Sequence, residues 1–198
     1  MLGKAHLAIG MAAAYTAVMP DTLPAALPVI TGAAAGSLIC DIDCESPAEK
    51  HDASKQRILA AVIAAAALIE DKVIDGGMWR SIAESGSYLW CVGIAGLVIT
   101  IAFASVSSHR GFSHSLLALL LETGFLYLIF PQTALPFAVA FATHLVLDIS
   151  NMKRVRLFYP AKKGISLRLF YADRLANRVC EAAGLIWLAA AVIISFRP

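Results

Sequence analysis

The residues in this sequence best suited to chemistry are histidines and aspartates at the ends of apolar segments. Imidazole nitrogens and carboxylate oxygens are the ligands that zinc and related divalent metals take from proteins. Four such groups occur along the chain: His6; Asp41 and Asp43; His109 and His114; and His144 and Asp148. If the ends of these segments meet in the fold, the seven residues predict a metal site.

His144 and Asp148 have the most informative spacing. Residues four apart share one face of a helix, one turn from each other, as helical metal ligands commonly do. An ionisable side chain at the end of a membrane span is costly unless it is paired or coordinated, so a functional site is the first interpretation. The structural alternative is that Asp148 pairs with His144 or with Arg110.

Asp41 and Asp43 stand two residues apart at the end of another apolar segment. Both carboxylates can turn toward one cation if the backbone there is irregular, and a two-metal site needs bridging carboxylates of this sort. A polar helix end followed by a turn explains the same pattern. Cys40 and Cys44 bracket the two aspartates, and packing explains these thiols better than a thiolate metal site does.

The segment from His109 to His114 joins two further apolar segments. Gly111 permits a tight turn that brings the two histidines together, and Ser113 is expected to cap the helix that follows. The alternative is one solvated and one buried, hydrogen-bonded histidine. Arg110 has a planar guanidinium suited to a substrate phosphate, but an arginine that only orients the protein in a membrane fits equally well.

The composition places these groups in a membrane protein. Of the 198 residues, 59% are hydrophobic and 15% are charged, and the mean hydropathy is +0.74, whereas about a quarter of the residues in a soluble domain are charged. We predict one domain, residues 1–198, with an all-α fold: a polytopic membrane helical bundle of six to seven apolar helices. The expected segments are 5–19, 23–40, 58–69, 88–107, 115–130, 135–149 and 180–196. Segment 58–69 covers only about 18 Å of a hydrocarbon core about 30 Å thick, so full crossing by the first three segments stays open.

Basic residues set the expected orientation, because cytoplasmic loops carry an excess of lysine and arginine. Segment 151–179 holds eight basic residues and one acid, Asp173, and is expected to be a basic cytoplasmic loop. Alternating spans then place the N-terminus and the loops 41–57 and 108–114 on the same side, with 13 of the 16 basic residues. All four His/Asp groups share that side, which is why His6 belongs with the others. His51 lies in a charged stretch that is expected to be solvated.

The segments around these residues resemble the YdjM-like family of LexA-regulated, inner-membrane-bound, metal-dependent hydrolases of bacteria. The resemblance covers about residues 1 to 160, and the loop His109 to Ser115 is its most specific part. It implies a location in the bacterial inner membrane, and it marks the same seven positions. Position 113 is Ser here, where relatives are expected to carry Thr. A fainter similarity is to zinc-dependent phospholipase C, in which His and Asp from several helices gather metals.

The expected function is a membrane-bound metal-dependent hydrolase, in particular a phosphoesterase acting on a lipid or another membrane-associated substrate. Zinc is the expected metal, with manganese or iron as alternatives, and one or two ions are expected. Asp43 or Asp148 would act as general base, and Arg110 would contact an anionic head group. The expected partners are the lipid bilayer and an anionic lipid or phosphate-containing substrate, with no nucleic acid.

Two other functions remain open at this point. A transporter or metal-handling protein should carry ionisable residues near mid-membrane on several helices, and here Glu122 is the only acid well inside a strong span. A non-catalytic membrane protein would bind metal for stability alone. The sequence leaves the oligomeric state open.

Overall fold

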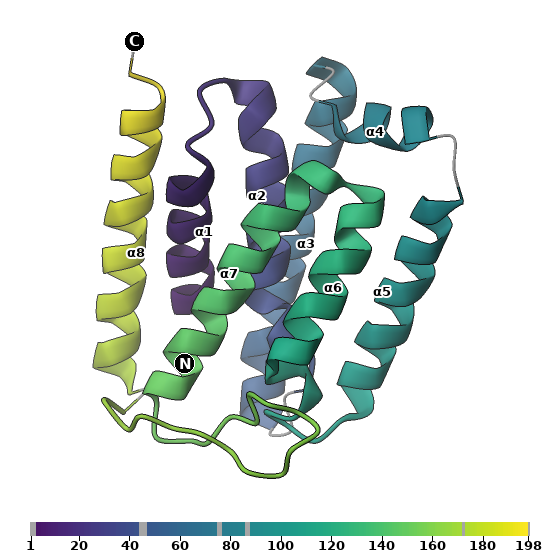
Figure 1. Ribbon diagram of the computed structural model, residues 1–198. Coiled ribbons are helices and arrows are strands. Elements are labelled where there is room, and N and C mark those ends of the chain that lie inside the picture. Colours follow the sequence, from purple (N-terminus) through teal and green to yellow (C-terminus); the bar gives the residue numbers. More distant parts are fainter. Residues whose placement is uncertain (1–2, 44–46, 75–76, 86–87, 172, 198) are drawn as a thin grey trace.

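The computed structural model describes residues 3–43, 47–74, 77–85, 88–171 and 173–197, which form a helical bundle (Figure 1). Its helices are α1 (Gly3–Val18), α2 (Leu23–Leu38), α3 (Pro47–Ile74), α4 (Met78–Ser85), α5 (Leu89–Val106), α6 (Leu116–Ile129), α7 (Pro131–Ser150) and α8 (Arg174–Ser195). Two 3₁₀ turns, η1 (Ile39–Asp43) and η2 (Phe112–His114), follow α2 and precede α6. Within the described residues, β pairing is limited to two isolated bridges. The all-α prediction is confirmed.

Four helical segments are long and apolar enough to cross a membrane: α2 with η1, α5, α7 and α8. Only 17% of the α5 window and 11% of the α8 window are buried inside the protein. Apolar side chains exposed over whole helices are what a lipid-facing surface requires. The chain therefore has the helices of a membrane protein. Of the predicted six to seven spans, these four are supported, and crossing by α1, α3 and α6 stays a prediction.

Several helix ends differ from the predicted ones. Helix α3 begins at Pro47, not residue 58, because the residues before its apolar part include good helix formers such as Ala, Lys, Gln and Arg. Helix α7 begins at Pro131, since proline suits the first helical position. Only Phe130 separates α7 from α6, and the two helices form an antiparallel hairpin (Figure 1).

The basic loop is shorter than predicted and ends at Asp173. The Asp173 carboxylate accepts a 2.7 Å hydrogen bond from the backbone N–H of Ala176, which makes it the N-cap of α8. This satisfies a backbone donor that the helix itself leaves unpaired. Arg174 and Arg178, expected in the loop, therefore belong to the first turns of α8.

Small residues let α2 pack closely on α7. A Cβ atom at Gly32 would collide with the carbonyl oxygen of Thr133, and one at Gly36 with the carbonyl oxygen of Phe137. Backbones this close are typical of glycine faces between membrane helices. The contact places η1, at the end of α2, beside the last turns of α7.

The long helices run alternately up and down, so particular termini gather at each end of the bundle (Figure 1). The start of α1, the ends of α2 and α7, and the loop 151–173 lie at one end. Helix α4 and the C-terminus lie at the other. The ends of the helices that carry the histidines and aspartates therefore meet.

Candidate metal site

The structure brings the predicted histidines and aspartates together at that end of the bundle. Four elements supply them: α1 gives His6, η1 gives Asp41 and Asp43, the segment before α6 gives His109 and His114, and α7 gives His144 and Asp148. Five of the seven are buried, while Asp41 and His109 are partly exposed.

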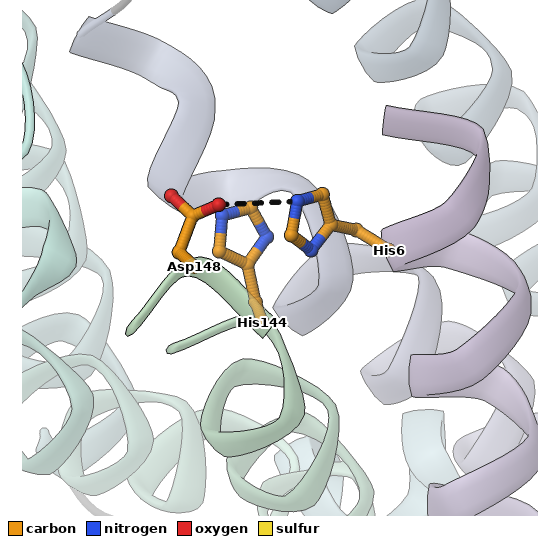
Figure 2. A group of neighbouring side chains, drawn as sticks. All are labelled: His6, His144 and Asp148. Atoms are coloured by element: carbon orange, nitrogen blue, oxygen red, sulfur yellow. Dashed lines mark ion pairs between the residues drawn. The ribbon is translucent and has the colours of Figure 1, made fainter. Parts of the chain in front are cut away.

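His6, His144 and Asp148 form one group of potential ligands (Figure 2), with donor atoms within 4.8 Å of one another. The imidazoles of His6 and His144 stack with centroids 3.8 Å apart, and Nε2 of His6 lies 3.5 Å from Oδ1 of Asp148. Neither ring nitrogen of His6 has a hydrogen-bond partner among the described residues. Buried nitrogens of this kind are rare, and a ligand explains them.

Asp41, His114 and His144 form a second group that shares His144 with the first. Oδ1 of Asp41 lies 3.6 Å from Nε2 of His144 and 3.9 Å from Nε2 of His114. Nε2 of His114 is also 3.3 Å from Oδ2 of Asp148. Bonds of about 2.0 Å to a tetrahedral zinc ion put ligand atoms about 3.3 Å apart, so these donors fit one divalent ion with small adjustments.

Hydrogen bonds to Nδ1 orient two of these imidazoles. Nδ1 of His144 donates to the carbonyl oxygen of Ser37 at 2.7 Å. The Ser113 hydroxyl donates to Asp43 at 2.5 Å, so it can accept from Nδ1 of His114, 2.8 Å away. In its neutral form each ring then carries its proton on Nδ1, which leaves the Nε2 lone pair for the site. Metal-binding histidines usually have such a partner behind them.

Asp43 has a different set of contacts from Asp41. Its Oδ1 lies 2.9 Å from Nδ1 of His109, and its Oδ2 accepts from the backbone N–H of Arg110 at 2.9 Å and from Ser113. Neither Asp43 nor His109 belongs to the two ligand groups. Asp43 therefore fixes the shape of the segment that carries both loop histidines.

Arg110 holds Asp148 in place. Its Nη2 lies 3.1 Å from Oδ2 of Asp148, and its Nη1 donates to the carbonyl oxygen of Lys153 at 3.1 Å. The residue is buried, and its backbone has φ of 59°, a left-handed conformation that is unusual outside glycine. The pair of Asp148 with Arg110, which was the structural alternative, is thus present. Asp148 also lies close to His6 and His114.

The site carries more negative than positive fixed charge. Three carboxylates, those of Asp41, Asp43 and Asp148, face one guanidinium, so neutral histidines would leave a charge of about −2, which a divalent cation matches. The effect is visible at His114. Burial alone would lower its pKa, but contacts with Asp148 and Asp43 raise it to about 9.

Comparison with known proteins gives the same assignment as the local motifs. The model of the YdjM inner membrane protein family matches residues 1–197. The chain belongs to this family. The match extends the resemblance from about residue 160 to nearly the whole chain, and with the apolar helices it identifies a membrane protein. No curated protein and no solved structure matches the chain.

Other residues considered from the sequence lie apart from the ligand groups of this YdjM-family protein. Cys40 is fully buried against Phe112, Phe137 and Phe141, so its predicted packing role is confirmed. Cys44 lies outside the described residues. His51 is exposed on α3, as expected for a solvated residue.

Two orienting groups were not foreseen. Ser113 was expected to cap a helix, but the N-cap of α6 is Ser115, whose hydroxyl accepts from Ala118 N–H at 3.1 Å. Ser113 lies two positions before that N-cap, and its hydroxyl contacts Asp43 and His114 instead. Its place between two site residues was a usable signal. The role of the Ser37 carbonyl could not be predicted, because every residue has a backbone carbonyl.

Proposed function

We propose that this protein is a membrane-bound, metal-dependent hydrolase whose zinc ion is held by Asp41, His114, His144 and Asp148. One observation carries the proposal: buried Nε2 atoms of His6, His114 and His144 have no hydrogen-bond partner in the described residues and face carboxylates. Imidazole and carboxylate donors suit zinc, with manganese or iron as alternatives. His6, stacked on His144, lies beside this ligand set.

The contacts favour one ion over two. Both ligand groups contain His144, yet its Nδ1 is committed to the Ser37 carbonyl and only Nε2 is left to bind metal. One nitrogen lone pair binds one ion. Asp148 links the groups, since Oδ1 faces His6 and Oδ2 faces His114.

A divalent ion in this site would polarise a phosphoryl or carbonyl oxygen and activate water, which is the chemistry that a hydrolase needs. The partly exposed side chains of Asp41 and His109 give the site its access to the outside. Asp43 contacts Nδ1 of His109, as the aspartate of a catalytic triad contacts its histidine. We therefore assign proton transfer to His109 and an orienting role to Asp43. Arg110 positions Asp148.

The site is proposed to face the cytoplasm of a bacterium. The loop 151–173, rich in lysine and arginine, lies at the same end of the bundle as the site and the N-terminus (Figure 1), and basic loops stay on the cytoplasmic side. An alkaline phosphatase fused behind the last residue should then be active, because the C-terminus lies at the opposite end. An inactive fusion that is produced at a normal level would contradict the proposed orientation.

Metal analysis of the detergent-purified protein tests the central claim. Wild type and His51→Ala, a control in an exposed histidine, should each retain about one zinc per chain after dialysis, and His144→Ala should lose it. Wild-type protein that binds no divalent metal even after zinc addition would overturn the proposal.

A second measurement separates the hydrolase from the non-catalytic alternatives. Phosphate monoesters and phospholipids are incubated with the zinc-loaded protein, with chelator, and with His109→Ala. Turnover that chelator abolishes and zinc restores supports the enzyme. Firm zinc binding with no turnover of any phosphate ester would favour a metal-handling or metal-stabilised protein.

The transporter alternative has less support in the described residues. Outside the site, their buried acids are Asp71 and Glu122. Asp71 accepts hydrogen bonds from the backbone N–H groups of Met78 and Trp79 at the start of α4, which is a structural role. Glu122 is then the remaining buried acid, on α6, whereas an ion path needs ionisable groups on several helices.

A further inference from the structure

A hollow in the loop 151–173 brings together three positive charges. It has a volume of about 390 Å³ and is lined by Arg154, Lys163, Gly164, Ile165, Ser166 and Arg168. Within the described residues, no carboxylate forms an ion pair with Arg154, Lys163 or Arg168. The one acid near the end of the loop, Asp173, caps α8. Cations without a paired carboxylate around one hollow favour the binding of an anion there.

Backbone pairing within the loop builds one wall of the hollow. Val155 and Ile165 exchange two 2.8 Å hydrogen bonds, which closes the intervening segment into a hairpin. At Gly164 an added Cβ would lie 2.9 Å from the Cβ of Arg154, so only glycine lets the two sides approach this closely. Arg154 and Lys163 thereby both line the hollow despite their like charges.

The end of α7 fixes the position of Arg168. The N–H groups of Leu167 and Leu169 donate to the carbonyl oxygens of Ile149 and Ser150, at 2.7 and 2.9 Å. Arg168, between the two anchored residues, has φ of 53°, which is disfavoured for a residue with a side chain. A strained arginine beside a hollow lined by cations points to a function that the strain serves.

The same loop is bonded to the candidate metal site. The backbone N–H of Arg156 donates to the carbonyl oxygen of Arg110, whose side chain in turn reaches Lys153. Leu167, the residue before Arg168, donates its N–H to the carbonyl oxygen of Ile149, the residue after Asp148. The hollow therefore lies on the segment that holds two residues of the site in place.

We propose that this hollow binds the phosphate group of an anionic ligand. Arginine forks and a lysine ammonium are the side chains that proteins use for phosphate. The apolar side chains of Phe158, Leu167, Leu169 and Tyr171 on the same loop are all more than half exposed, which suits the head-group region of a bilayer. If the protein is the proposed hydrolase, phosphate is the group by which the hollow recognises its substrate. Phosphate binding itself does not depend on hydrolase activity.

Binding to the metal-free protein tests the proposal independently of hydrolysis. Chelator-treated protein in dodecyl maltoside is titrated with inorganic phosphate and, separately, with dihexanoyl phosphatidic acid. Arg168→Gln and Lys163→Gln should each weaken binding about tenfold or more, as expected for a lost charge-assisted hydrogen bond. Lys162→Gln removes the adjacent lysine, which does not line the hollow, and should bind within about twofold of wild type.

Each outcome decides the proposal. Equal affinity for both probes indicates that the phosphate group alone is recognised, and tighter binding of the lipid indicates a head group at the bilayer; both support the site. Absence of binding by wild type, or unchanged affinity in both Arg168→Gln and Lys163→Gln, would show that these basic residues serve membrane orientation only. Lys163→Gln keeps the strained position intact, so a folding defect in Arg168→Gln leaves the test valid.

Discussion

Asp43 and Ser113 lie 70 residues apart in the sequence, yet the Ser113 hydroxyl donates a 2.5 Å hydrogen bond to the Asp43 carboxylate. The same hydroxyl lies 2.8 Å from Nδ1 of His114. The three side chains form a relay from η1 through the loop to an imidazole of the candidate metal site. The orientation of His114 therefore depends on Asp43, which belongs to neither group of potential ligands.

Loss of the Ser113 hydroxyl should weaken metal binding. Ser113→Ala removes both hydrogen bonds and should lower zinc affinity about 10- to 100-fold, as loss of orienting partners typically does. Ser113→Thr keeps a hydroxyl and should bind zinc like wild type. Competition with a chromogenic chelator gives both affinities, and equal values for Ser113→Ala and wild type would exclude the relay.

Metal binding should release a proton from His114. Its pKa is raised to about 9, above the usual 6.5, so at pH 7 the metal-free protein holds this imidazole protonated. The associated stabilisation is complete below pH 6.5 and is lost as the pH rises through about 9. Zinc requires the neutral ring. Calorimetry in two buffers of different ionisation enthalpy should show proton release at pH 7 and less at pH 10; zinc binding without release at pH 7 would contradict this.

The sequence predicted the all-helical fold for physical reasons. Apolar segments long enough to become helices must alternate in direction when short loops join them, and alternation alone brings His6, Asp41, His114 and His144 to one end. Helix ends were predicted less accurately where polar residues continue a helix, as before Ile58 in α3, or where a capping residue fixes the start, as Asp173 does for α8.

The division of labour within the site was not predictable. Asp41 and Asp43 look equivalent in sequence, but a turn of 3₁₀ helix points one toward His144 and the other toward the backbone of Arg110. Such a difference depends on interatomic distances near 3 Å, which only the packed structure sets. Pairing of Asp148 with Arg110 was among the alternatives that the sequence offered, and Nη2 of Arg110 lies 3.1 Å from Oδ2 of Asp148.

Truncation of Arg110 should destabilise the protein. The residue is buried and pairs with the buried Asp148, and removal of one partner of such a pair costs about 3–5 kcal/mol, because the other charge stays buried. Arg110→Ala should therefore lower the unfolding temperature in detergent markedly. Arg156→Ala, which removes an exposed arginine whose Nη1 bonds Ser108, is the control and should change it little. Equal unfolding temperatures for the two variants would argue against a positioning role for Arg110.

Close packing of α2 on α7 should influence the metal site, because α2 leads directly into η1, which carries Asp41, and α7 carries His144. In Gly36→Ala the new methyl group would meet the carbonyl oxygen of Phe137, so the helices must separate. Overpacking of this kind costs about 1–3 kcal/mol, and a shift between Asp41 and His144 should also weaken zinc binding.

Gly124→Ala is the matched control, since nothing lies within 4 Å of an added Cβ there, and in a helix the change should stabilise by about 1 kcal/mol. Thermal unfolding and zinc titration of both variants measure the two effects. Unaltered zinc affinity in a destabilised Gly36→Ala protein would show that the site does not depend on this helix contact.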